Sequence, residues 1–157
     1  MSIESVKDYL RSWNRDTDIL EFDSSTATVD AAAQALGVIP ARIAKTLSFR
    51  STGPSGILVV AAGDARIDNQ LFRTVFGLKA KMLSPEEVLE QTGHAVCGVC
   101  PFGLAQPLPV YLDISLKRFD TVFPACGSSH SAIELSLDEL EEYARAVEWV
   151  DICKDWR

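Results

Sequence analysis

The chain has 157 residues, 47% of them hydrophobic and 24% charged, which is enough for one compact domain with its own core. Its formal net charge of −7 argues against an extended DNA-binding surface, because such surfaces rely on clustered Lys and Arg. No apolar run reaches the roughly eighteen residues that cross a bilayer, and the N-terminal sequence is patterned as an amphipathic helix rather than a signal peptide. We expect a single cytoplasmic domain over residues 1–157 without membrane contact.

The first part of the chain predicts a helix, a short strand and a second helix. Residues 2–14 carry apolar side chains at helical spacing, so this helix packs on the core by one face. Residues 19–22 are typical of a short strand. Thr28 is suited to cap a second helix, which Gly37 ends.

A β-hairpin over residues 45–62 is predicted at the centre of the fold. Residues 45–50 alternate in polarity, residues 53–56 form a Gly-Pro turn, and residues 57–62 are an apolar strand. The alternation places Lys45 on one face with Leu47 and Phe49. A lysine on a buried sheet is unfavourable unless it is paired or faces a cleft. We therefore predict a functional role for Lys45 rather than a stem that only reaches toward solvent.

The remaining elements are short and alternate irregularly. A helix is predicted over residues 67–76, and Asp64 and Asp68 near its start are interpreted as helix caps. The further predicted elements are a strand at 79–83, a helix at 84–92, strands at 109–113, 121–125, 132–135 and 147–153, a helical turn at 114–119 and a helix from Ser136. Because regular βαβ alternation is missing, we expect an α+β domain with a mixed, strongly curved, barrel-like sheet flanked by helices.

Two loops rich in small residues are candidates for ligand binding. The first, GHAVCGVCPFG at residues 93–103, combines glycines with a proline that fixes the backbone. The N–H groups of Gly98, Val99 and Cys100 are suited to hold a carbonyl, hydroxyl or phosphate group; the alternative is an ordinary tight turn. The second loop, GSSHS at residues 127–131, is expected to flank the same cleft. Its serines are expected to donate hydrogen bonds rather than to act as nucleophiles.

Four cysteines raise a metal or redox alternative. Cys97 and Cys100 form a CxxC motif, and the further candidate ligands are His94, Cys126 and His130. A second CxxC is missing, and the Pro101 that follows the motif does not suit a thioredoxin-like site. We expect reduced thiols, no cofactor and no required metal, and keep zinc or redox chemistry as the alternative.

Taken together, these motifs resemble the YbaK/prolyl-tRNA synthetase-associated domain family. The likeness extends over about residues 25–153 and is carried in order by IAKTLSF, ILVVAAGDARID, GHAVCGVCPFG, PVYLD and FPACGSSHSAIEL. It implies an aminoacyl-tRNA deacylase that hydrolyses a small mischarged amino acid, namely alanine, cysteine or serine, chiefly on proline tRNA. A non-catalytic module that binds aminoacyl-tRNA or an amino acid is the alternative on the same fold.

The resemblance also implies roles for particular residues. The family's key lysine corresponds to Lys45, and its Gly-x-x-x-Pro loop to residues 97–101. The implied catalytic residues are Lys45 and the main chain of Gly98, Val99 and Cys100; the implied substrate contacts are Cys97, Pro101, Phe102, Gly127, Ser128, Ser129 and His130. Cys97 stands at a glycine position of the family, Cys126 at a common alanine and His130 where asparagine is frequent. The side chains of Cys97, Cys100 and His130 are expected to shape a tight pocket that admits small amino acids and excludes proline.

The implied partner is the acceptor end of an aminoacyl-tRNA, with prolyl-tRNA synthetase as a further candidate. An acidic protein can bind this end locally, because residues 41–81 contain seven basic and two acidic side chains. Their basic members are Arg42, Lys45, Arg50, Arg66, Arg73, Lys79 and Lys81.

Overall fold

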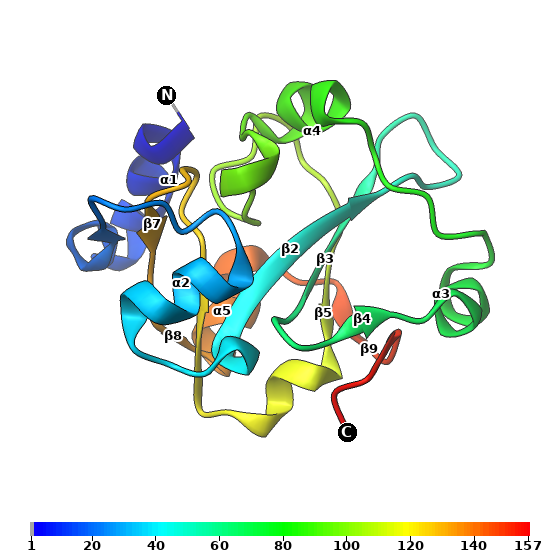
Figure 1. Cartoon of the computed structure of the whole chain (residues 1–157). Coiled ribbons are helices and arrows are strands. Elements are labelled where there is room, and N and C mark those ends of the chain that lie inside the picture. The colour runs from blue at the N-terminus through cyan, green and yellow to red at the C-terminus, as the bar shows by residue number, and fades with distance from the viewer. Residues whose placement is uncertain (1) are drawn as a thin grey trace.

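A mixed six-stranded sheet forms the centre of the fold in the computed structural model, which describes residues 2–157 (Figure 1). The strand order is β8-β6-β2-β3-β5-β9. The bounds are Ile43–Phe49 for β2, Ile57–Ala62 for β3, Val110–Asp113 for β5, Thr121–Pro124 for β6, Leu135–Ser136 for β8 and Glu148–Val150 for β9. Antiparallel pairs join β2 to β3 and β6 to β8, whereas the other pairs are parallel. The α+β class with a mixed, curled sheet is therefore confirmed.

The predicted hairpin is confirmed, although β2 begins at Ile43, two residues before the expected start. Lys45 lies opposite Ala61, and Phe49 lies opposite Ile57, so Lys45, Leu47 and Phe49 share one face of the sheet. The strand predicted at 79–83 is wrong: only Met82 forms a bridge, with Phe49. Two main-chain hydrogen bonds, from Arg50 to Lys81 and from Leu83 to Ser48, tie this segment to the end of β2. This is too little pairing to extend a strand.

Two further predicted strands are divided between sheets. Residues 132–135 contribute to β7 (Ser131–Ala132), which pairs with β1 (Leu20–Glu21), and to β8 in the main sheet. Residues 147–153 are likewise divided between β9 and β10 (Cys153–Lys154), which pairs with β4 (Arg66–Ile67). Each short strand takes its partner from a different part of the chain. Local alternation of polarity does not report such a change of partner.

Five helices within residues 2–157 surround the sheet, and they begin and end largely where capping residues predict. Their bounds are Ser2–Leu10 for α1, Val29–Leu36 for α2, Asn69–Phe76 for α3, Pro85–Thr92 for α4 and Leu137–Ala144 for α5. Thr28, Asp68, Ser84 and Ser136 accept N-terminal amide hydrogen bonds. The helix expected at 67–76 starts later because Asp68 caps it. The helix expected at 2–14 changes at Arg11 to the 3₁₀ turn Arg11–Trp13.

Short 3₁₀ turns complete the connections between these elements. They cover Asp16–Asp18, Pro40–Arg42, Val96–Gly98 and Ile114–Arg118. The turn Val96–Gly98 lies inside the predicted glycine-rich loop, and Ile114–Arg118 confirms the helical turn expected there. No helix among residues 2–157 has the length and apolar character to cross a membrane.

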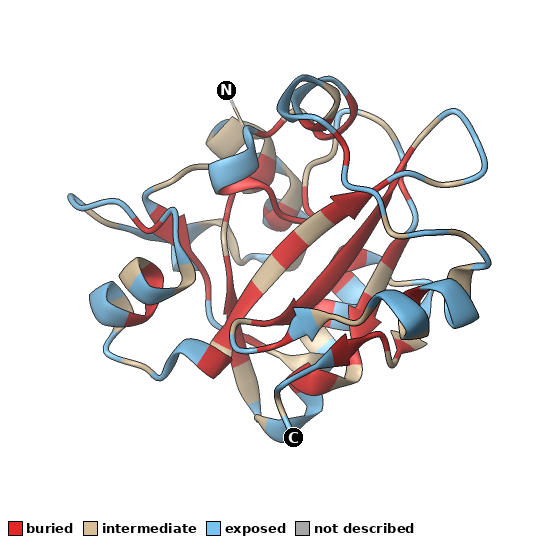
Figure 2. Cartoon of the chain, turned by 45° about the vertical axis from the view of Figure 1, so that its right-hand side comes forward, coloured by how far each residue is buried: buried red, intermediate tan, exposed pale blue. Residues whose placement is uncertain are grey.

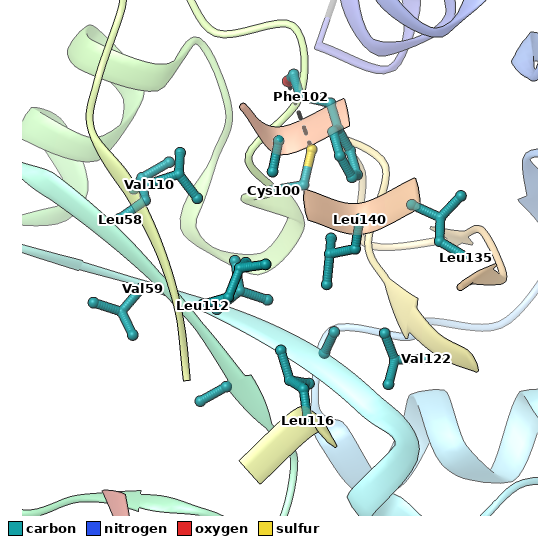
Figure 3. Packing of buried hydrophobic residues seen from close by; sticks show 14 of the residues in the cluster. Leu58, Val59, Cys100, Phe102, Val110, Leu112, Leu116, Val122, Leu135 and Leu140 are labelled. Carbon is teal, nitrogen blue, oxygen red and sulfur yellow. Dashed lines mark hydrogen bonds between the residues drawn. The ribbon is translucent and has the colours of Figure 1, made fainter. Parts of the chain in front are cut away.

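The core lies against both faces of the two central strands. Every residue of β3 is buried (Figure 2), because β3 lies between two strands and is covered on both faces. On one face, Leu58, Leu112 and Leu140 are fully buried and gather between the sheet and α5 (Figure 3). On the other, Phe49 packs against Phe72 of α3 with ring centroids 4.9 Å apart. The buried centre holds β2 in place for the site described next.

Candidate active site

A cavity of about 210 Å³ lies beside the free edge of β2. β6 pairs only with Ile43 and Ala44, and residues 81–83 contact this side of β2 from Ser48 onward, so the stretch between them is open and forms one wall. Residues 26–29 and Ala32 form a second wall, and residues 96, 97 and 99 of the first loop form a third. Ala125, Ser131 and Ala132, beside the second loop, close the cavity. The two predicted loops therefore do border one cleft.

Lys45 contributes to the cavity wall, and its side chain is half-buried. The Nζ atom donates hydrogen bonds to the carbonyl oxygen of Gly63, at 3.3 Å, and to that of Ala65. Burial lowers the pKa of the Lys45 ammonium, and the charges of Cys153 and Asp64 act in the opposite direction. Lys45 forms no ion pair within residues 2–157. Its charge is thus held by neutral carbonyl groups and remains available to an anion.

The first loop uses part of its main chain internally. The N–H of Gly98 donates to the carbonyl of Ala95 at 2.9 Å, and that of Val99 to the carbonyl of Val96 at 3.4 Å. The N–H of Cys100 has no acceptor within the part of the chain that the structure describes. The expectation of three free N–H groups is therefore corrected, because a 3₁₀ turn engages two of them.

The two loops touch through their main chains at Gly98. The N–H of Gly127 donates to the carbonyl oxygen of Gly98 at 3.0 Å. A Cβ atom added to Gly98 would lie 2.6 Å from the nitrogen of Ser128. Gly127 has a φ of 92°, a conformation that glycine adopts readily. These two glycines set the distance between the loops and hence one side of the cavity.

Two of the predicted contact residues in the first loop face the core instead. Pro101 and Phe102 are buried and do not line the cavity. Phe102 stacks on Tyr9 of α1 with centroids 6.4 Å apart. Burial raises the pKa of the Cys100 thiol to about 12, and its sulfur lies 3.7 Å from the Phe102 carbonyl oxygen, which the dashed line in Figure 3 marks. These residues hold the loop by packing rather than through contact with the cavity.

The cysteines of the CxxC motif occupy different environments. Cys97 is exposed and lines the cavity, whereas Cys100 is fully buried. Cys100 lies 3.7 Å from His94 Nε2, and that ring nitrogen lies 2.7 Å from the Phe102 carbonyl. Burial also raises the pKa of Cys126. Within residues 2–157, no group of three or more His, Cys, Asp or Glu side chains is placed to hold a metal ion.

The second loop supports the cavity from behind. His130 is exposed, its Nδ1 lies 3.0 Å from the carbonyl of Ser24, and its side chain does not line the cavity. The carbonyl of Ser129 accepts the N–H of Thr26 at 2.6 Å. Ser128 Oγ donates to Ser131 Oγ at 2.9 Å, and only Ser131 of these reaches the cavity wall. His130 and Ser129 therefore fix the residues 24–26 that lead into the wall.

Sequence reasoning missed Thr46 as a site residue. Thr46 lines the cavity and is 7% exposed, yet its hydroxyl has no hydrogen-bond partner among residues 2–157. A buried hydroxyl without a partner is unfavourable. The detectable signal was its place in the hairpin, since a polar residue next to Lys45 must point to the opposite face. Residues 26–29 were missed as well, because only the fold brings them to β2.

The positively charged block is partly neutralised within the protein. Arg42 pairs with Glu134, and Arg50 with Glu87. The remaining exposed cations make no ion pair within residues 2–157, and Lys154 lies opposite Arg66 in the β4–β10 pair. We call these residues the basic face: Arg66, Arg73, Lys79, Lys81 and Lys154. They lie on β4, on α3, on the segment after it and on β10, at the right of Figure 1.

Comparison with known proteins gives three consistent likenesses. A family model described as "Aminoacyl-tRNA editing domain" matches residues 23–143. The chain is 60% identical over 156 residues to the uncharacterized protein YwhH of Bacillus subtilis (strain 168), covering 99% of each. It is 26% identical over 133 residues, 83% of this chain and 74% of the other, to EbsC of Enterococcus faecalis (strain ATCC 700802 / V583), named as a candidate Cys-tRNA(Pro)/Cys-tRNA(Cys) deacylase.

A solved structure shares the whole fold. It is described as a candidate trans-editing enzyme for prolyl-tRNA synthetase, and it superposes with a TM-score of 0.88 at 30% identity. The match covers 98% of this chain and 97% of that one.

Proposed function

Because the chain belongs to the family of aminoacyl-tRNA editing domains, as its motifs predicted, we propose that the cavity beside β2 hydrolyses the ester of a small mischarged amino acid on tRNA. The observation that carries this proposal is the joint placement of Lys45, the first loop and the buried Thr46 on one cavity at the open edge of β2. The supporting likeness is to relatives named for deacylation and trans-editing.

The reaction makes modest chemical demands. A water oxygen forms a bond to the ester carbonyl carbon, the bond from that carbon to the ribose oxygen breaks, and the ribose oxygen takes a proton. Since an aminoacyl ester is already activated, a site that orients the ester and stabilises the developing negative charge on its carbonyl oxygen accelerates hydrolysis. Gly98 and Val99 use their N–H groups within the first loop, whereas the N–H of Thr46, on the cavity wall, has no acceptor within residues 2–157 and is available as such a donor. Under this proposal the reaction needs neither a metal nor a covalent intermediate.

Lys45 has the role of holding the acceptor end. Its ammonium is bound only by the neutral carbonyl groups of Gly63 and Ala65. A phosphate group of the terminal nucleotides would attract this charge more strongly than those carbonyls do. A small movement of the side chain would exchange one set of acceptors for the other. Lys45 would thus position the ester rather than take part in bond making.

The basic face is proposed to contact the neighbouring phosphates of the tRNA acceptor stem. Its five cations are not neutralised by carboxylates within residues 2–157. Met82 lines the cavity, so Lys81 beside it connects the basic face to the site. This arrangement lets a protein of net charge −7 bind the end of a nucleic acid, because only local phosphate contacts are required.

The substrate is proposed to be alanine, cysteine or serine, most readily on proline tRNA. Editing of such amino acids is needed because a synthetase pocket gains only about 1–3 kcal/mol from each methylene. The descriptions of EbsC as a candidate Cys-tRNA(Pro)/Cys-tRNA(Cys) deacylase and of the solved relative as a candidate trans-editing enzyme support the proline system and a role beside prolyl-tRNA synthetase. In the cavity itself, Cys97 lines the wall together with Val99, at a position where the family resemblance places a glycine.

Turnover of charged tRNA tests the proposal. Proline tRNA charged with alanine, cysteine, serine or proline is mixed with the protein, and free amino acid is measured against spontaneous hydrolysis. We expect catalytic release of at least one small amino acid and no acceleration for prolyl-tRNA. Tight binding of the charged tRNA without turnover would instead support a non-catalytic binding module. Loss of turnover with a chelator, together with stoichiometric zinc in the protein, would support the zinc alternative.

A further inference from the structure

On the free edge of β2, Thr46 combines a buried side-chain hydroxyl with main-chain groups that have no partner within residues 2–157. Its Oγ1 atom is buried and has no partner among residues 2–157. The side chain faces the same side of the sheet as Val60, which lies opposite Thr46 in the hairpin register. Leaving such a hydroxyl unpaired costs about 1–3 kcal/mol. This unfavourable state is removed when a ligand brings a hydrogen-bonding group to the cavity.

The main chain of Thr46 also lacks partners on this edge. Two residues earlier, Ala44 pairs with β6. Two residues later, the carbonyl of Ser48 accepts the N–H of Leu83 at 3.2 Å. Because alternate residues of a strand direct their main-chain groups to the same side, the N–H and C=O of Thr46 point into the gap between these contacts. No main-chain group within residues 2–157 bonds to them.

We propose that Thr46 recognises the amino-acid part of the substrate and that its hydroxyl selects a small amino acid whose side chain carries a hydroxyl group, serine first. This inference rests on the proposed deacylase function and names its preferred substrate class. The main chain of Thr46 has one acceptor for the α-ammonium group and one donor for the ester carbonyl. These are the two hydrogen bonds that directly opposed residues exchange in an antiparallel pair.

Such pairing determines where the substrate side chain lies. Residues that pair across two strands carry their side chains on the same face, with Cβ atoms about 4.5–5.5 Å apart. The Cβ of an aminoacyl group bound to Thr46 therefore comes beside Oγ1. Oγ1 can donate and accept, so it can bond to a serine hydroxyl. The flanking residue on the same face, Ala44, is small and leaves room for this group.

Alanine and cysteine are expected to be hydrolysed more slowly than serine, to different degrees. Alanine would occupy the same place but leave the Thr46 hydroxyl unpaired, and a thiol is a weaker hydrogen-bonding group than a hydroxyl. A site built around a polar group disfavours a substrate that cannot bond to it. The order of hydrolysis is therefore serine, then cysteine, then alanine.

Single-turnover deacylation with substitutions at Thr46 tests this inference. Thr46→Val removes the hydroxyl and keeps the shape and main chain, Thr46→Ser keeps the hydroxyl, and Thr17→Val is a matched control at an exposed site. Seryl- and alanyl-tRNA are the two substrates. Wild type is expected to hydrolyse seryl-tRNA about tenfold faster or more. Thr46→Val should lose about tenfold on seryl-tRNA and change less than about twofold on alanyl-tRNA, whereas Thr46→Ser and Thr17→Val keep the preference.

The outcomes separate this inference from the proposed function. Equal loss on both substrates in Thr46→Val, or no loss on either, would overturn the selective role of the hydroxyl while leaving deacylation established. Absence of turnover by wild type on every charged tRNA would overturn the proposed function and this inference with it. Should Thr46→Val fail to fold, Thr46→Ala compared with Thr46→Ser tests the same difference of one hydroxyl.

Discussion

The carbonyl oxygen of Gly98 accepts a hydrogen bond from the N–H of Gly127 at 3.0 Å, so the two loops of the site meet main chain to main chain. At Gly98 an added Cβ would meet the Ser128 nitrogen at 2.6 Å and its Cα at 2.7 Å. Side chains essentially never approach main-chain atoms so closely, so this contact requires glycine at Gly98. The width of the cavity depends on it.

Gly98→Ala is expected to separate the loops. We predict a loss of about 1–3 kcal/mol in the free energy of unfolding from overpacking, together with at least a tenfold loss of deacylation. Gly53→Ala is the control, because the nearest atom to its Cβ would be Ser51 Oγ at 3.7 Å, an ordinary contact. Denaturant unfolding and deacylation rates measured on both variants check this. Unchanged activity in Gly98→Ala would contradict the role given to the loop contact.

Charge reversal on the basic face is expected to weaken tRNA binding. The double variant Arg73→Glu with Lys79→Glu should raise KM several-fold and flatten the dependence of binding on salt, because fewer counterions are released. Lys7→Glu with Arg11→Glu carries the same charge change on α1 and the 3₁₀ turn that follows it. That control removes only exposed ion pairs of about 0–1 kcal/mol. Equal effects of the two double variants would show that the basic face is not the tRNA contact.

Cys97 is expected to be the thiol that reacts in the folded protein. It is exposed on the cavity wall, whereas the other three cysteines are buried, and burial raises the pKa of Cys100 to about 12. Iodoacetamide should therefore modify Cys97 first and block deacylation as it does so. Peptide mass spectrometry locates the modified residue. Cys97→Ser should resist inactivation; inactivation of this variant at the wild-type rate would contradict the assignment.

His94 is expected to make stability depend on pH. It is fully buried, and burial lowers its pKa from the ordinary 6.5. As pH falls, the unfolded chain therefore binds the proton before the folded protein does. The free energy of unfolding is constant in this respect above a pH of about 6.5 and decreases between that pH and the lowered pKa of the folded state. The slope is at most about 1.4 kcal/mol per pH unit. Urea unfolding at several pH values measures this slope. His94→Gln should flatten it, while His130→Gln at the exposed second histidine should not; equal slopes for both variants would refute the prediction.

Local sequence patterns predicted the elements whose structure depends on local chemistry. Thr28, Ser84 and Ser136 cap helices as expected because an N-cap needs only its own hydroxyl and nearby amides. The hairpin and the face that carries Lys45 followed from the alternation of polarity and the Gly-Pro turn. The strand at 132–135 was predicted as continuous, but its two ends pair with β1 and β6. Pairing partners distant in sequence leave little trace in local composition.

Part of the site was predictable from local sequence, and part depends on the fold. Lys45 and the two loops were identifiable from a lysine on an apolar face and from clustered small residues. The wall of residues 26–29 and the unpaired Thr46 hydroxyl depend on where β6 stops pairing with β2. The family resemblance implied a substrate contact at Phe102, but its ring packs on Tyr9. Neighbours in sequence share a loop without sharing its exposed face.

The rate of ester hydrolysis by wild type and Lys45→Ala tests the central claim most directly. Mischarged seryl- or alanyl-tRNA is incubated with each protein, and circular dichroism verifies that the variant is folded. The control is Lys117→Ala, which removes a lysine that lies over the Trp149 ring. The account predicts rapid release of the amino acid by wild type and by the control, and at least about a hundredfold slower release by Lys45→Ala, the scale of a lost positioning contact. Wild-type activity in folded Lys45→Ala, or a wild-type rate no faster than spontaneous hydrolysis, would contradict it.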